Sequence, residues 1–132
     1  MKQEFGAGGI ILNNEKIALV FQRTTQTWSF PKGHIIPGKT LEETARREIY
    51  EEIGIKDMAL IKKIGTYSRG SKKSLNLQKN VTIFLFKPND IRLTSHDKEN
   101  PTAKWVPIEK VAETLSYPKE KEFFNKVITL IK

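Results

Sequence analysis

The sequence contains no cysteine, so it can form neither a disulfide framework nor a thiolate site. No apolar run approaches the roughly 20 residues that a membrane-spanning helix requires, and the first residues lack the apolar stretch of a secretory signal peptide. No repeat, low-complexity tract or long linker divides the 132 residues. These absences favour a cytoplasmic protein with a single domain over residues 1–132, a monomer or homodimer with no membrane partner.

Negatively charged residues are also scarce. The chain has 15 aspartate and glutamate residues against 23 lysine and arginine residues, which gives a formal net charge of +8. A basic protein attracts polyanions over a Debye length and accelerates their encounter, so nucleotides, polyphosphates and RNA are all suitable partners. A general bias towards lysine explains the charge equally well, and charge alone therefore does not identify the ligand.

Short β-prone runs bounded by turn residues predict a sheet. We expect strands over residues 5–12, 16–22, 27–30, 58–67, 77–87 and 103–106. Residues 31–39 are rich in proline and glycine and should form a loop. Helices are expected over residues 40–53, 107–115 and 119–130. The last helix should turn Phe123, Val127 and Leu130 inward. Strands mixed with helices in this way indicate an α/β layered domain.

The helix over residues 40–53 is marked at both ends. Thr40 followed three residues later by Glu43 forms a capping-box pattern, in which hydroxyl and carboxylate satisfy free amides of the first turn. Gly54 is typical of a helix C-terminus. Apolar residues recur at four-residue steps and form one stripe: Leu41, Ala45, Ile49 and Ile53.

Three glutamates crowd a second stripe of the same helix. At about 100° per residue, Glu51 and Glu52 project within about 60° on either side of Glu48. Like charges at this spacing repel one another, and a bound cation would reverse that effect. Hard oxygen ligands favour Mg²⁺ or Mn²⁺, which also bridge phosphate oxygens of a substrate. A glutamate-rich face alone is more often solvated surface, and Arg47 could simply pair with Glu43 and Glu51.

The segment from Gly33 to Ile55 resembles the Nudix box. That box has a glycine, five residues, a glutamate, seven residues, and then Arg-Glu-aliphatic-any-Glu-Glu-any-Gly-aliphatic. In this chain Gly33 is followed at the right spacings by Lys39 and by residues 47–55, REIYEEIGI. Every fixed position matches except Lys39, which stands where the family has glutamate.

The resemblance continues outside the box and covers nearly the whole chain. Residues 5–12 are similar to the opening strand of the family. Residues 28–34, WSFPKGH, are similar to the lead-in of its diadenosine polyphosphate hydrolase branch. Residues 105–107 resemble the step from strand to helix near its C-terminus. The implied architecture is the Nudix fold, a mixed β-sheet sandwiched between α-helices with a loop-helix-loop catalytic motif.

The resemblance also implies a site. Glu48, Glu51 and Glu52 would hold Mg²⁺ or Mn²⁺ with the Gly33 carbonyl as a further ligand, and Arg47 would orient the carboxylates. The metal would neutralise phosphate charge and position an acidified water for in-line attack on a phosphoanhydride bond. A remaining carboxylate, from Glu51, Glu52 or the more distant Glu99, would act as base.

Glu99 stands six residues before Trp105, and the diadenosine polyphosphate hydrolase branch has a comparable glutamate. It is otherwise a surface-loop residue. Candidate substrate-binding residues are Arg23, Lys32, His34, Lys39, Tyr67 and Phe84. In this set the cations could hold phosphate and the aromatic rings could stack on a base, although each residue also suits an ordinary solvated or core position.

A basic loop between the fourth and fifth strands carries Arg69, Lys72, Lys73 and Lys79. It could contact a polyphosphate tail or simply improve solubility.

The leading hypothesis is a metal-dependent pyrophosphohydrolase acting on a nucleoside diphosphate linked to another moiety, with dinucleoside polyphosphates favoured by residues 28–34 and the positive charge. A nucleoside triphosphate, ADP-ribose or an RNA 5′-end would suit the same residues. A different class is a module that binds nucleotides or RNA and has lost catalysis. Lys39 supports that reading, and the intact glutamates argue against it.

Overall fold

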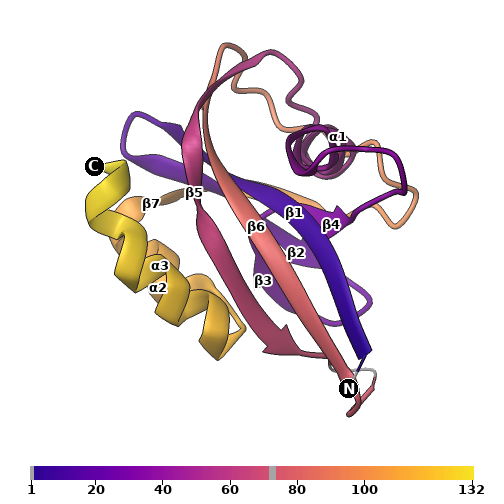
Figure 1. Cartoon of the computed structure of the whole chain (residues 1–132). Helices are drawn as coiled ribbons and strands as arrows, with labels where there is room; N and C mark the ends of the chain where they lie inside the picture. Colours follow the sequence, from indigo (N-terminus) through magenta and orange to yellow (C-terminus); the bar gives the residue numbers. More distant parts are fainter. Residues whose placement is uncertain (1, 72–73) are drawn as a thin grey trace.

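The computed structural model describes residues 2–71 and 74–132, and these form a mixed β-sheet with helices on both faces (Figure 1). The strands are β1 (Lys2–Asn13), β2 (Lys16–Gln22), β3 (Thr27–Ser29), β4 (Lys32–His34), β5 (Met58–Gly70), β6 (Leu77–Pro88) and β7 (Thr102–Pro107). Their order is β3-β2-β1-β6-β5, with β4 paired to β1 and β7 paired to β2. The predicted α/β layered fold is confirmed.

Strand β1 is the element on which the others are assembled. It pairs in parallel with β6 from Lys2 opposite Leu77 to Ile11 opposite Phe86, and antiparallel with both β4 and β2. Residues 6–11 are buried, as expected of a strand that is covered on both faces.

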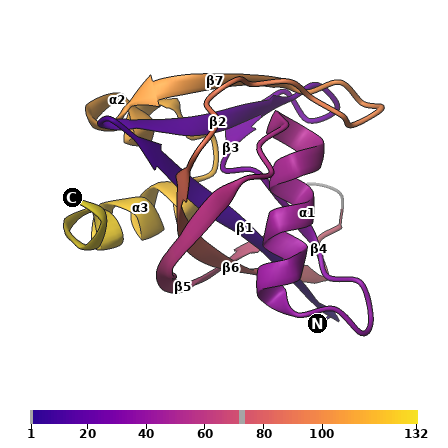
Figure 2. The ribbon, with the colours of Figure 1, turned by 90° about the horizontal axis from the view of Figure 1, so that it is seen from above.

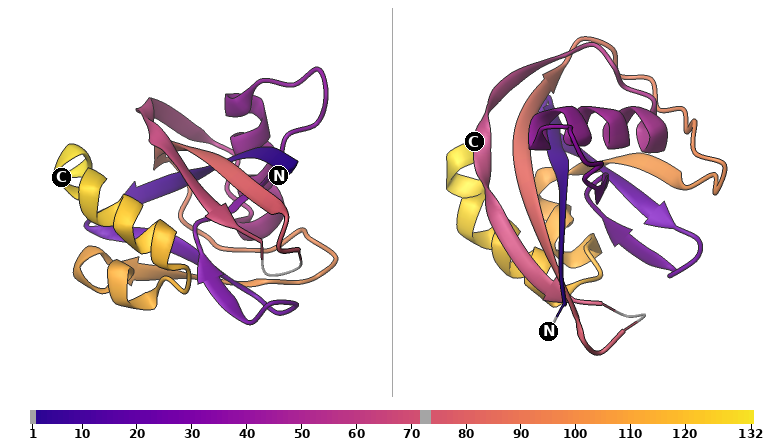
Figure 3. Two further views of the ribbon diagram at one scale, coloured as in Figure 1. Left: turned by 60° about the horizontal axis from the view of Figure 1, so that its bottom comes forward. Right: turned by 45° about the vertical axis from the view of Figure 1, so that its right-hand side comes forward.

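Helix α1 (Leu41–Ile53) lies on one face of the sheet, and α2 (Ile108–Thr114) and α3 (Pro118–Ile131) lie on the other (Figures 2 and 3). Each interface has its own core. Phe84 and Phe86 of β6 belong to the core beneath α1, whereas Ile83 and Leu85 belong to the core beneath α3. This alternation follows from the two-residue period of a strand and fixes which side chains can reach each helix.

Both ends of α1 form as predicted. The Thr40 hydroxyl accepts a hydrogen bond from the Glu43 N–H at 3.1 Å, and the Glu43 carboxylate accepts one from the Thr40 N–H at 2.8 Å. Gly54 ends the helix in the left-handed conformation with φ 83°. The segment before β7 then crosses this end, because the Thr94 N–H donates to the Ile53 carbonyl at 2.8 Å.

Two local expectations were wrong. Residues 31–39 are not entirely a loop, because Lys32 to His34 pair with Gly6 to Gly8 of β1 and form β4. Long-range pairing here overrides the local proline and glycine signal. Leu130 is 50% exposed, and Ile131 is buried instead. The buried face of α3 consists of residues that recur at steps of three and four: Glu120, Phe123, Phe124, Val127 and Ile131.

In the described ranges of the chain, every helix is too short or too polar to cross a membrane.

The contact at the end of α1 generates a test with a matched control. Gly54 and Gly38 both have positive φ, but a Cβ at Gly54 would collide with the Thr94 carbonyl, whereas a Cβ at Gly38 meets nothing within 4 Å. Gly38→Ala should destabilise the fold by about 1–2 kcal/mol through backbone strain. Gly54→Ala should add a further ~1–3 kcal/mol because the Thr94 segment must move. Urea unfolding of the two variants measures the difference, and equal losses of stability would contradict the packing described.

Candidate active site

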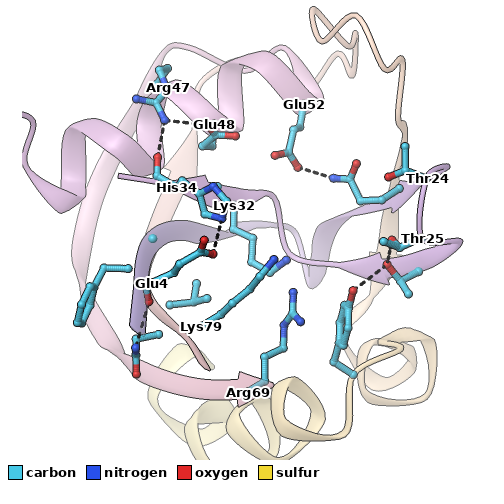
Figure 4. A pocket seen from close by; sticks show the side chains of 18 of the residues that line it. Glu4, Thr24, Thr25, Lys32, His34, Arg47, Glu48, Glu52, Arg69 and Lys79 are labelled. Atoms are coloured by element: carbon cyan, nitrogen blue, oxygen red, sulfur yellow. Dashed lines mark hydrogen bonds and ion pairs between the residues drawn. The ribbon is translucent and has the colours of Figure 1, made fainter. Parts of the chain in front are cut away.

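A pocket of about 450 Å³ opens between α1 and the sheet. Its walls come from β1, β4, the turn between β2 and β3, the pocket-facing side of α1, the adjoining ends of β5 and β6, and Tyr117 (Figure 4). Carboxylates of α1 lie along one wall, and three cations from β4, β5 and β6 lie at the opposite end. The pocket is therefore strongly polarised.

Glu48 and Glu52 are one helical turn apart and form the acidic wall. Glu52 is 3% exposed, and its Oε1 accepts a hydrogen bond from the Gln22 side chain of β2 at 3.0 Å. Burial raises the pKa of Glu52 well above its ordinary value, the positive charge of Lys32 opposes this, and the negative charge of Glu48 adds to it. Burial favours the neutral form of this carboxyl group, and a cation bound beside it would favour the charged form.

Gly33 sets the distance between α1 and β4. A Cβ at this position would overlap the carboxyl group of Glu48. Only glycine therefore allows the Glu48 carboxylate to lie directly on the β4 backbone. The closeness brings the Glu48 oxygens next to the peptide groups of β4, where a carboxylate and a carbonyl can serve one cation.

Arg47 links the helix to the strand from outside the acidic wall. Its Nη2 donates to the His34 carbonyl and to Glu48 Oε2, both at 2.8 Å, and its Nε lies 3.9 Å from Glu51 Oε1. One guanidinium thus orients two carboxylates and the backbone of β4. Glu43, the other expected partner, instead caps the helix at Thr40.

The donor set suits a hard divalent cation. Glu48 and Glu52 supply carboxylate oxygens, Glu52 is buried beside Glu48, and the Gly33 backbone lies against Glu48. Across residues 2–71 and 74–132, no three acidic, histidine or cysteine side chains already surround one point. A metal ion shared by three carboxylates would therefore require these side chains to move.

Glu51 does not line the main pocket, and its side chain is 42% exposed. Burial, Glu48 and Asp97 raise the pKa of Glu51, and Arg47 opposes them. Asp97 was not considered from the sequence, because it lies in a polar run with no periodic pattern. Glu99, which was considered, is exposed and donates its backbone N–H to Asp97.

Lys32, Gly33 and His34 of the predicted substrate-binding segment line the pocket, but Arg23 and Lys39 do not. His34 Nε2 lies 3.0 Å from Glu4 Oε1. Lys39 instead borders a separate small hollow with Ile36, Glu43 and Arg47.

The aromatic residues predicted to stack on a base are placed differently. Tyr67 and Phe84 are buried in the two cores and do not line the pocket. The Tyr67 hydroxyl donates to the carboxylate of Glu120, which is fully buried. Trp28 also lies outside the pocket, where it packs against Phe21 and lies beneath Lys104.

Both ends of the predicted basic loop belong to strands. Arg69 is the residue before the end of β5, Lys79 belongs to β6, and both line the pocket. Lys72 and Lys73 lie outside the described residues. Sequence reasoning missed Gln22 and Tyr117 altogether, because neither belongs to a recognisable motif and each reaches the pocket only through the tertiary fold.

A family model described as the NUDIX domain matches residues 2–127. The putative mutator protein MutT4 of Mycobacterium tuberculosis is 31% identical over 140 residues, covering 97% of this chain and 56% of that protein. A putative 8-oxo-dGTP diphosphatase of Bacillus subtilis is 45% identical over 65 residues, covering 48% of this chain and 43% of that protein. The chain spans about half the length of these curated relatives.

Among solved structures, the Ap4A hydrolase of Caenorhabditis elegans is similar with a TM-score of 0.77 and 24% identity, and the match covers 100% of both chains. At this identity the likeness shows the fold.

The contact between Gly33 and Glu48 generates a second test. Gly33→Ala should displace the Glu48 carboxylate and lower the rate of phosphoanhydride hydrolysis by roughly 100-fold, since small displacements of reacting groups have effects of that size. Gly70→Ala is the control, because a Cβ there meets nothing within 4 Å although Gly70 directly follows Arg69, which lines the same pocket. Initial rates and thermal midpoints of both variants should be measured together. A folded Gly33→Ala protein with the rate of Gly70→Ala would contradict the role of this contact.

Proposed function

The chain belongs to the Nudix family, and we propose that it hydrolyses a phosphoanhydride bond in a nucleoside diphosphate-linked substrate. Nudix hydrolases generally need divalent metal ions and act on small nucleotides, and some act on RNA. The observation that carries the proposal is the buried Glu52 beside Glu48, facing a pocket whose opposite end is cationic.

We assign Mg²⁺ or Mn²⁺ to Glu48, Glu51, Glu52 and the Gly33 carbonyl. When bound, such an ion neutralises charge on phosphate oxygens and activates water for attack. Arg47 holds Glu48 and Glu51 in place and ties them to β4 through the His34 carbonyl. Gln22 fixes the orientation of Glu52 from the opposite side.

The proposed reaction forms one bond and breaks one. A water oxygen bonds to phosphorus, the bridging P–O bond breaks in line with it, and the bonding electron pair leaves on the departing phosphate oxygen. The proton released by water passes to a carboxylate of the group formed by Glu51, Glu52 and the loop acids Asp97 and Glu99. Asp97 is the loop acid whose charge acts on Glu51, so it joins Glu99 as a candidate for this step.

The replacement at Lys39 does not remove anything from the acidic wall. Lys39 is exposed and borders the separate hollow, whereas Glu48 and Glu52 line the main pocket. Arg47 already has the His34 carbonyl, Glu48 and Glu51 as acceptors. These contacts support an active enzyme over a binding module that has lost catalysis.

Within the proposed class, dinucleoside polyphosphates, nucleoside triphosphates, ADP-ribose and RNA 5′-ends share the bond that is cut. The resemblance of residues 28–34 favours the first of these. That segment brings Lys32, Gly33 and His34 to the pocket but leaves Trp28 outside it. The group attached to the nucleoside diphosphate would therefore be selected by the cations at the other end of the pocket.

Glu52→Gln tests the acidic wall. The substitution keeps the shape and the hydrogen bond with Gln22 within reach while removing one negative charge, so Mg²⁺-dependent phosphate release should fall at least about 100-fold. Glu42→Gln is the matched control on the same helix, because Glu42 pairs only with Arg46 among the contacts described and lies outside the pocket. Release of phosphate or of nucleoside monophosphate is measured over a panel of the four substrate types.

Two results would contradict the proposal. One is Glu52→Gln turning over at the rate of Glu42→Gln in saturating Mg²⁺. The other is full wild-type activity after the protein has been stripped of metal and transferred to metal-free buffer.

A further inference from the structure

Tyr117 lines the pocket beside the three cations, and one face of its ring is already covered. The Arg69 guanidinium carbon lies 3.8 Å from the centroid of the Tyr117 ring, which is the distance of a direct cation–π stack. On the edge of the same ring, the hydroxyl accepts a hydrogen bond from Thr27 at 3.4 Å. The face on which Arg69 lies is therefore unavailable to a nucleoside base.

The same end of the pocket gathers three cations from three strands. Lys32 comes from β4, Arg69 from β5 and Lys79 from β6, and their side chains point towards one another (Figure 4). Lys32 Nζ also lies 5.7 Å from the Tyr117 ring. Partial burial lowers the pKa of Lys79, the charges of Arg69 and Lys32 lower it further, and the negative charge of Glu4 opposes this. The three cations repel one another, Glu4 offsets that repulsion in part, and an anion bound between them would relieve it further.

Arg69 itself is built into this end rather than left at the surface. It is 8% exposed, its Nη1 donates to the Gly70 carbonyl at 3.0 Å, and within residues 2–71 and 74–132 nothing accepts a hydrogen bond from its buried Nε. The fully buried Glu120 lies behind the cations and accepts from Tyr67. Burial raises the pKa of Glu120, so this carboxyl offsets at most one of the three positive charges.

We propose that Lys32, Arg69 and Lys79 form a subsite for an unsubstituted terminal phosphate, and that Arg69, by covering Tyr117, excludes an aromatic base from this end. A terminal phosphate, bridged on one side only, carries more charge and more free oxygens than an internal phosphate bridged on both sides, so it suits three convergent donors better. Arg69 is the residue that determines specificity, because it supplies a planar donor fork and also covers the ring that a base would use.

The inference rests on the proposed function and narrows its substrate, against the dinucleoside polyphosphates that the resemblance of residues 28–34 favours. A chain of phosphates would run from the acidic wall at Glu48 and Glu52 to the cationic end, with its terminal group at Arg69. The nucleoside would remain at the mouth, where Phe5 and Ile36 are exposed. The substrate class is then a nucleoside 5′-polyphosphate with one free end, rather than a dinucleoside polyphosphate with a base at both ends.

Binding without metal tests the subsite separately from catalysis. Protein stripped of metal and desalted into metal-free buffer is titrated with inorganic tripolyphosphate by isothermal calorimetry. Wild type should bind, and Arg69→Ala should bind at least about tenfold more weakly, as expected from losing charge-assisted hydrogen bonds. Arg92→Ala removes the same charge from a side chain that is 87% exposed and lies outside the pocket, and it should leave the affinity unchanged.

Selectivity is measured with adenosine 5′-tetraphosphate and diadenosine tetraphosphate, which have equal numbers of phosphates and differ in whether the last one is free. Wild type should prefer the free end by about tenfold or more, and Arg69→Ala should lose that preference. Lys79→Met should weaken both ligands yet keep the preference, because Arg69 still covers Tyr117. Thermal midpoints confirm folding, and Lys79→Met keeps the test informative should Arg69→Ala unfold.

The outcomes separate the two proposals. Equal wild-type affinity for the two tetraphosphates, or an Arg92→Ala loss as large as that of Arg69→Ala, overturns the subsite. Tripolyphosphate binding that depends on Arg69, in a protein with no hydrolytic activity on any nucleotide, keeps the subsite and overturns the proposed function.

A 5′-triphosphorylated oligoribonucleotide carries the same terminal group as adenosine 5′-triphosphate. Comparing the affinities of the protein for these two ligands identifies whether the bound phosphate belongs to RNA or to a free nucleotide. If the binding of either ligand depends on Arg69, the subsite is supported.

Discussion

The site depends on how closely α1 approaches β4. Because Gly33 has no side chain, the Glu48 carboxylate lies on the strand backbone, and Arg47 joins the same strand through the His34 carbonyl. The helix face that carries the glutamates is thus fixed against β4 rather than left in solvent. The pairing of β4 with β1 and the core beneath α1 hold the two sides of this contact in register. Moving either side would separate the carboxylates from the backbone oxygen proposed to share their metal.

The charges along the pocket are unfavourable for stability when considered alone. Glu52 is buried beside Glu48, and Arg69 is buried beside Lys32 and Lys79, so like charges are crowded at both ends. Desolvation of such groups is expensive unless each has a partner of opposite sign. The fold supplies partial compensation through Gln22, Glu120 and the Tyr117 ring. The remaining imbalance is relieved by a cation at one end and an anion at the other, which a metal-bound polyphosphate provides together.

The helix α1 could be predicted from sequence because its signals are local. Thr40, Glu43 and Gly54 mark its ends within single turns, and the spacing of the glutamates fixes their common face without knowledge of the fold. Strand β4 could not be predicted, because its pairing with β1 involves residues about 25 positions away. The same reason hid the cationic end. Arg69 stands in a polar stretch that is typical of a solvated loop, and only the pairing of β5 with β6 turns it inward.

The departure at Lys39 shows how far a motif and a site can differ. A glutamate at this position would be one more acceptor near Arg47, but Arg47 is already held by a carbonyl and two carboxylates. Glu43 is engaged at the helix cap, and the positive charge of Lys39 lies beside it rather than beside Glu52. The geometry of the acidic wall therefore depends on residues that face β4 and β2, and Lys39 faces neither. The motif is continuous in sequence but divided in space. Glu48 and Glu52 line the pocket, whereas the cap region only positions the helix that bears them.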